Sequence, residues 1–128
     1  MQTLFVEGAP EAIGPYCHAV RSGPFYFLSG QTPLDAETMQ LVGDTIEEQT
    51  GRVLYNISTV LNGLGLGLVD VVKTTVYLSD MAHFHGMNEV YGKIFEGHRP
   101  ARTTIAVREN PLGALVEIEC IAEADGDR

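Results

Sequence analysis

The chain has 128 residues, which is enough for one domain around a single hydrophobic core. Apolar residues make up 45% and charged residues 20%, values that exclude an intrinsically disordered chain. Eight basic and 17 acidic residues give a net charge of −9, and the lysines are Lys73 and Lys93 alone. Such a surface repels phosphate backbones and anionic lipid headgroups, so we expect neither nucleic acid nor a membrane as a partner.

The cysteines and the first residues indicate the compartment. Cys17 and Cys120 are too few for a disulfide framework and are typical of packed thiols in a reducing environment. Residues 1–7 have neither the basic start nor the apolar run of a secretory signal. No apolar stretch approaches the roughly 20 residues that span a bilayer. We therefore expect a cytoplasmic protein.

The first predicted elements are strands. Residues 3–6 form a short strand, and residues 16–21 and 25–28 form a hairpin around the turn at 22–24. Pro33, soon after this hairpin, prevents a helix from starting there.

A helix follows the hairpin. Thr45 and Glu48 have the spacing of a capping box, and apolar residues then recur at helical spacing as far as Leu64. Glycines at 63, 65 and 67 end this helix. Because they follow a helix and precede a strand, they indicate a helix end and a turn, not a phosphate-binding loop.

The second half repeats the order of strands and helix. A strand rich in β-branched residues is predicted at 71–78, and Asp80 caps a second amphipathic helix that ends at Gly97. Two further strands are predicted at 102–107 and 115–122.

These elements predict one α+β domain over residues 1–128, with an acidic, mobile tail at 123–128. Its mixed sheet has about six strands, and two one-sided helices pack on one sheet face. Alternation in the last two strands predicts that four polar side chains point away from the helices. They are Arg102, Thr104, Glu117 and Glu119. Apolar neighbours on that face favour an oligomer interface, and a solvated antiparallel face is the alternative.

Arg102 and Glu117 are the residues with a chemical interpretation. On neighbouring strands they could form a surface salt bridge. They could instead bind a substrate, with the guanidinium group holding a carboxylate and the glutamate handling protons. Spacing alone does not decide between these readings. His83 and His85 lie two residues apart, on different helix faces, so we expect no metal site.

Seven segments occur in a fixed order between Leu4 and Ala122. They are Ala12-Ile-Gly-Pro-Tyr16, Ser29-Gly-Gln31, Gly43-Asp-Thr-Ile-Glu-Glu-Gln-Thr50, Asp70-Val-Val-Lys-Thr-Thr75, Met87-Asn-Glu-Val-Tyr91, Pro100-Ala-Arg102 and Val116-Glu-Ile-Glu119. In residues and spacing they resemble the reactive intermediate deaminase family (RidA, also called YjgF). The resemblance implies a fold like the Bacillus-type chorismate mutase and a homotrimer with pockets between subunits. It also implies hydrolysis of 2-imino acids or their enamines, such as 2-iminobutanoate and 2-iminopropanoate, to 2-keto acids and ammonia. A protonated imine is already electrophilic, so we expect no metal or organic cofactor.

The resemblance also implies roles for single residues. Arg102 would bind the substrate carboxylate, and Glu117 would position the attacking water. The other matching pocket positions are Tyr16, Gly30, Asn88 and the backbone of Thr104. Departures from the family pattern are His18, Thr103 and Asn110. A carboxylate-binding or chaperone-like trimer without catalysis stays as the alternative, and a ribonuclease or translation inhibitor fits the negative charge poorly.

Overall fold

The computed structural model describes residues 1–124, in which six strands form one mixed sheet of order β1-β2-β3-β6-β4-β5. β4 and β5 run parallel, and every other pair of neighbours is antiparallel. The strands are β1 (Gln2–Leu4), β2 (Ala19–Ser22), β3 (Phe25–Gln31), β4 (Val71–Leu78), β5 (Ala101–Ala106) and β6 (Val116–Glu123). The predicted α+β architecture is confirmed.

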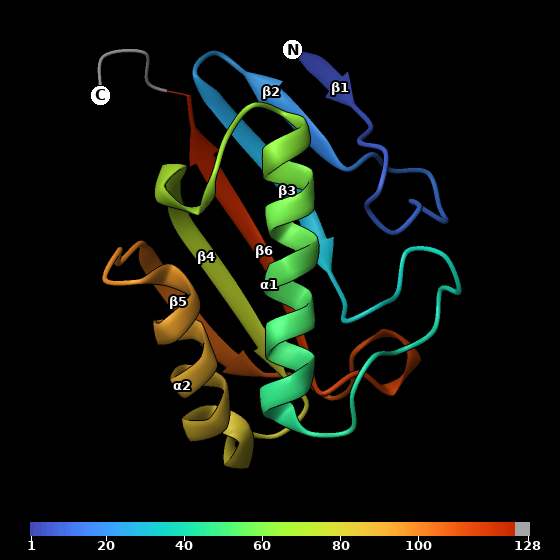
Figure 1. The fold of residues 1–128 in the computed structure, drawn as a ribbon, viewed down its shortest axis with the longest axis vertical. Helices are drawn as coiled ribbons and strands as arrows, with labels where there is room; N and C mark the ends of the chain where they lie inside the picture. Colours follow the sequence, from blue (N-terminus) through green and yellow to red (C-terminus); the bar gives the residue numbers. More distant parts are fainter. Residues whose placement is uncertain (125–128) are drawn as a thin grey trace.

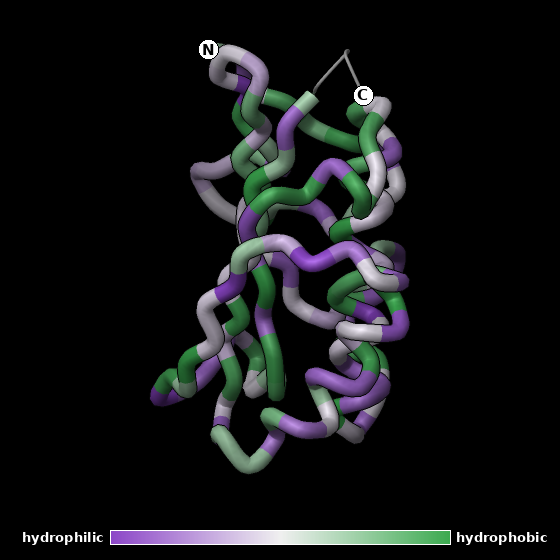
Figure 2. The backbone as a smooth tube through the Cα atoms, turned by 90° about the vertical axis from the view of Figure 1, so that its left-hand side faces the viewer, coloured by the Kyte–Doolittle hydropathy of each residue, from purple (hydrophilic) through white to green (hydrophobic). Residues whose placement is uncertain are grey.

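Both helices lie across the same face of the sheet (Figure 1). They are α1 (Ile46–Gly63) and α2 (Phe84–Phe95). In the view turned by 90°, the helical coils lie to one side of the extended segments (Figure 2). Within residues 1–124, no helix covers the other sheet face. No helix in the described part of the chain is long and apolar enough to cross a bilayer.

The capping box predicted for α1 is present. Thr45 Oγ1 accepts a hydrogen bond from the Glu48 amide at 3.1 Å, and Glu48 Oε1 accepts one from the Thr45 amide at 3.2 Å. Downstream, the apolar stripe of α1 packs onto the sheet, with Val53 and Leu61 fully buried. Burying a side chain of this size contributes about 1.5–3 kcal/mol, so packing holds α1 more than its cap does.

The start and end of α2 differ slightly from the prediction. Asp80 caps a separate turn of 3-10 helix at Met81–His83, where its Oδ1 accepts from the Ala82 amide at 2.8 Å. The α-helix ends at Phe95, and Glu96 takes a left-handed conformation with φ 49° ahead of Gly97.

The central strand β6 shows the predicted alternation. Val116, Ile118, Cys120 and Ala122 are buried toward the helices. Glu123 ends this strand, and the Ala124 amide donates to the Pro24 carbonyl at 2.8 Å, so ordered structure enters the expected tail. The rest of that predicted mobile tail, 125–128, lies outside the described residues.

Candidate active site

Glu117 lies on the sheet face without helices. It alternates with buried Val116 and Ile118 and is paired with Tyr77 across the β4–β6 ladder. Gly30 of β3 lies directly beside it, at a register shift in the β3–β6 pairing. A Cβ atom on Gly30 would be 2.5 Å from Glu117 Oε2. The absence of a side chain at Gly30 therefore makes room for this carboxylate.

The surroundings of Glu117 change its acidity. Partial burial raises the pKa of the Glu117 carboxyl above its ordinary value of 4.5, and the nearby charge of Glu119 raises it further. Glu119 itself accepts a hydrogen bond from the Tyr77 hydroxyl at 2.8 Å. A carboxylate with a raised pKa is a better proton acceptor near neutral pH, which suits general base chemistry.

A cavity of about 210 Å³ opens beside Glu117, and we call it the Glu117 pocket. Residues 10–18 and the stretch from Gly30 to Met39 form its two walls, and Pro111 and Leu112 lie at its edge. Tyr16 and Gly30, both predicted pocket residues, are among its lining residues. Most of this lining is apolar, so the carboxylate lies next to a surface that would accept a small hydrophobic group.

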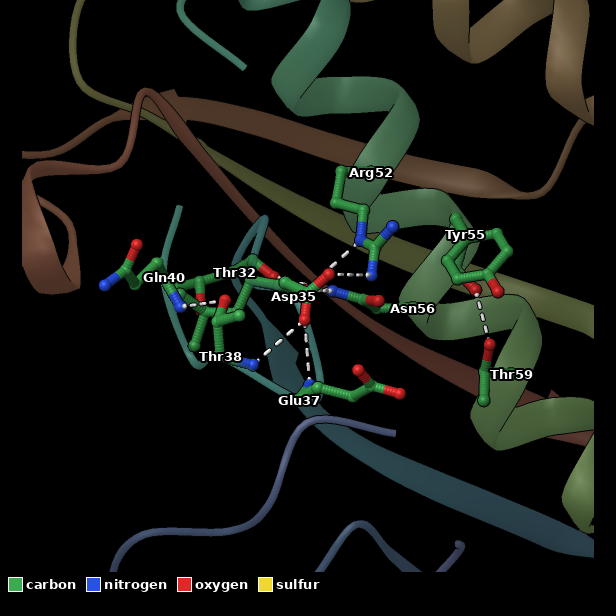
Figure 3. A network of polar contacts seen from close by, with 10 residues as sticks. Thr32, Asp35, Glu37, Thr38, Gln40, Arg52, Tyr55, Asn56 and Thr59 are labelled. Carbon is green, nitrogen blue, oxygen red and sulfur yellow. Dashed lines mark hydrogen bonds and ion pairs between the residues drawn. The ribbon is translucent and has the colours of Figure 1, made fainter. Parts of the chain in front are cut away.

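The second wall is tied to α1 by polar contacts (Figure 3). Asn56 is 1% exposed and donates to the carbonyls of Thr32 at 3.1 Å and Leu34 at 2.9 Å. Arg52 donates to the same Leu34 carbonyl at 3.2 Å and pairs with Asp35 at 3.7 Å. Helix α1 thereby fixes a loop that lies outside the named strands and helices.

Arg102 lies on the opposite face of the sheet. It is paired with Thr74 of β4, and the Thr74 hydroxyl is 2.8 Å from the Tyr91 hydroxyl of α2. The Arg102 guanidinium carbon is 4.8 Å from the Tyr91 ring centroid and 5.7 Å from that of Phe84. It thus stacks over two aromatic rings on the helix side.

The prediction that Arg102 and Thr104 share a sheet face with Glu117 is therefore wrong. In the parallel β4–β5 register, Thr104 pairs with Val76, a fully buried residue under the helices. The apolar Ile105 faces the other way and is 44% exposed. Aromatic rings of α2 cover Arg102. The polar side chains of Arg102 and Thr104 in the edge strand β5 therefore face the helices.

A second cavity, of about 570 Å³, lies along Arg102 between α2 and the segment 97–100, and we call it the Arg102 cavity. Asn88 also lines it. Within the described residues Arg102 forms no ion pair, since the two ion pairs found there join other residues. The side-chain oxygens of Asn88 and Thr104 are also buried, and neither has a hydrogen-bond partner among residues 1–124. This side of the sheet thus offers a cation without an anion.

The six predicted site residues therefore form two groups. Tyr16, Gly30 and Glu117 meet in the Glu117 pocket, whereas Asn88 and Arg102 line the Arg102 cavity, with Thr104 on the same sheet face. One copy of the chain does not bring Arg102 and Glu117 together.

Other candidate groups are accounted for by packing. Burial raises the pKa of the Cys120 thiol to about 12, so it is a poor nucleophile at neutral pH. Cys17 donates to the Ala19 carbonyl at 3.3 Å. In residues 1–124, no three His, Cys, Asp or Glu side chains are placed to hold a metal ion.

Comparison with known proteins places the chain in a family. A family model described as Endoribonuclease L-PSP matches residues 6–124. A RutC family protein of Pyrococcus horikoshii is 46% identical over 121 residues, which are 94% of this chain and 96% of that protein. The 2-iminobutanoate/2-iminopropanoate deaminase of Mus musculus is 43% identical over 114 residues, 89% of this chain and 84% of that protein. The chain belongs to the YjgF/RidA family.

Solved structures of the YjgF/RidA family share its fold. RidA from the Antarctic bacterium Psychrobacter is 37% identical with a TM-score of 0.91, and the match covers 96% of this chain and 99% of that one. E. coli TdcF, solved with bound serine, is 33% identical with a TM-score of 0.91, covering 98% and 100%.

Proposed function

We propose that this chain hydrolyses 2-imino acids, or their enamine tautomers, to 2-keto acids and ammonia. The observation that carries the proposal is the complementary pair of half-sites. One offers a carboxylate with a raised pKa beside an apolar pocket, and the other offers a guanidinium group without an anion. Relatives at 43% identity named Reactive Intermediate Deaminase A and 2-iminobutanoate/2-iminopropanoate deaminase support this reaction class.

The reaction asks little of the protein beyond positioning. A protonated imine is already electrophilic at C2, so an oriented water molecule can attack it. The water oxygen forms a bond to C2, the C=N electron pair moves to nitrogen, and Glu117 takes the proton of the water. When that proton passes to the nitrogen, ammonia leaves, the hydroxyl proton of the intermediate passes to Glu117 and then to solvent, and the C–O bond becomes the keto group.

Arg102 would hold the substrate carboxylate through its planar, two-pronged guanidinium group. Since Arg102 and Glu117 lie on opposite faces of the sheet, we propose that each site combines Arg102 of one copy with Glu117 of a neighbour in a homotrimer. The exposed far face supports such an assembly, because it carries Phe25 and Phe27 at 37% and 44% exposure. Three chains of 13.9 kDa would give a particle of about 42 kDa in light scattering.

Two other functions make different predictions. A ribonuclease, as the description of the family model suggests, needs a surface that attracts phosphate, and a net charge of −9 opposes this. A carboxylate receptor needs Arg102 but has no use for a half-buried glutamate. Salt-dependent binding of RNA would favour the first, and keto-acid binding without acceleration of imine loss would favour the second.

The test couples the protein to a threonine dehydratase, which releases the imine, and measures 2-oxobutanoate formation in competition with semicarbazide. Arg102→Lys keeps the charge but loses the planar fork, and we expect a roughly hundredfold loss of imine turnover. Glu117→Gln should abolish turnover while calorimetry still detects binding of 2-oxobutanoate. Arg108→Lys, at an exposed site, is the control and should behave as wild type. Wild-type turnover in the Glu117→Gln protein would overturn the proposed mechanism.

A further inference from the structure

His18 is a buried histidine whose ring bonds to the main chain at two points. It is 5% exposed. The Val6 amide is 2.8 Å from Nδ1, and the Pro10 carbonyl oxygen is 2.8 Å from Nε2. A main-chain amide can only donate and a carbonyl can only accept, so Nδ1 must be the acceptor and Nε2 must carry the hydrogen. These two contacts select the neutral ring with its proton on Nε2.

The two contacts attach a wall of the Glu117 pocket to the sheet. The backbone of His18 is itself fixed, because its amide donates to the Leu4 carbonyl at 3.1 Å and its carbonyl accepts from the Ser29 amide at 3.0 Å. From this base the ring reaches back to Val6 and Pro10. The chain from Pro10 onward, with the ring of His18 itself, lines the Glu117 pocket.

We propose that His18 is a positioning residue whose neutral ring holds this wall in place, and that protonation of the ring releases the wall and lowers activity in acid. This inference rests on the proposed function. A second proton can enter only at Nδ1, where it turns the acceptor of the Val6 amide into a donor. Two N–H groups then face each other, and the contact to Val6 is lost.

Titratable groups lie on both sides of His18. Glu7 and Glu11 line the cavity on one side of His18, and Glu117 lines the pocket on the other side. Tyr16 and Cys17 precede His18 in the chain. The Phe5 ring meets it edge-on with centroids 5.9 Å apart. The hydrogen bond from the Val6 amide forms only with the uncharged ring, because Nδ1 must accept it.

The first arm of the test needs no substrate. At about pH 8 the ring ¹⁵N chemical shifts of His18 should be those of a neutral ring protonated on Nε2. As the pH falls, the Val6 amide should lose protection from hydrogen exchange over the same range in which the ring becomes charged. A ring protonated on Nδ1 at about pH 8, or a charged ring with an unchanged Val6 amide, would overturn the proposal.

The second arm compares matched variants. A glutamine can accept from Val6 through its oxygen and donate to Pro10 through its nitrogen, and it does not titrate. His18→Gln should therefore keep kcat/KM within about twofold of wild type at neutral pH and lose the part of the acid decline that coincides with the His18 titration. His18→Leu makes neither bond and should raise KM about tenfold in an intact assembly. The exposed His85, changed to Gln, is the control for removal of an imidazole and should keep the wild-type pH profile.

These outcomes separate the two proposals. An unchanged acid decline in His18→Gln overturns the role of His18, even where His18→Leu does not fold. If the wild-type protein hydrolyses no imine, the proposed function fails, and with it the effect of His18 on activity, while the ¹⁵N shifts still decide how the ring is bonded.

Discussion

At Glu117, burial opposes the charge that the proposed chemistry needs. A raised pKa means that this carboxyl holds its proton more tightly in the folded chain than in the unfolded chain. Its unfavourable effect on stability is thus absent below the ordinary value of 4.5 and grows as the pH rises through the folded-state pKa. We expect Glu117→Gln to raise the melting temperature at about pH 8 and to leave it unchanged at about pH 3, as measured by thermal unfolding. A gain of equal size at both values would contradict this origin.

Gly30 tests the placement of the same carboxylate. An alanine Cβ would come within 2.5 Å of Glu117 Oε2, so Gly30→Ala must displace the carboxylate. Misplacement of a catalytic group by about 1 Å can cost a hundredfold in rate, and we expect a loss of this order in kcat with little change in melting temperature. Gly67→Ala meets no atom within 4 Å and is the control. Full activity in Gly30→Ala would show that the position of Glu117 does not matter.

At the scale of elements, α1 holds the second wall of the Glu117 pocket through Asn56. Loss of its two donated bonds would leave the Thr32 carbonyl with only the Leu34 amide and the Leu34 carbonyl with only Arg52 as donors, so Asn56→Ala should destabilise the fold by about 1–3 kcal/mol in urea unfolding. KM for the imine should rise as the loop loosens. The control is Asn62→Ala, which makes the same substitution at an exposed position of α1. Comparing the two variants removes the contribution of the higher helix propensity of alanine. Equal stability of the two variants would contradict the role of Asn56.

Some of these elements could be predicted because their signals are local. The capping box of Thr45 and Glu48 and the alternation of β6 depend on residues near one another in the chain, and both are confirmed. Asn56 gave a weaker signal, as a polar residue on the apolar stripe of α1. The carbonyls that it contacts are 22 and 24 residues away, and no local pattern identifies them.

The facing of β5 could not be predicted from alternation alone. Its side chains alternate between polar and apolar, but the apolar Ile105 is on the open face, and Arg102 lies under the rings of α2. The side chains of β5 that face the helices are determined by its parallel register with β4 and by the aromatic rings of α2 that pack against it. Family resemblance therefore named Arg102 and Glu117, and only the structure placed them on opposite sides.

At the scale of the whole molecule, the open sheet face is more apolar than a solvated face needs to be. Phe27 pairs with Ile121 across the β3–β6 ladder, on the side that also carries Glu117. Ile105, on the same face of the far edge, is 44% exposed. An interface between copies would cover this face and bring a neighbour close to Glu117, which one copy leaves open.

Mixed assemblies test whether one active site draws on two copies. Arg102→Ala and Glu117→Gln chains, each expected to be inactive alone, are co-expressed with different tags, and trimers with both tags are isolated. In a ring of three, either composition contains one contact at which an intact Arg102 meets an intact Glu117 of the neighbour. Activity should therefore return to about one third of wild type per trimer. Two differently tagged Arg102→Ala chains should stay inactive, which excludes an effect of tagging. If mixed trimers assemble but are inactive, Arg102 and Glu117 do not act together across two copies. That result would contradict the proposed shared site.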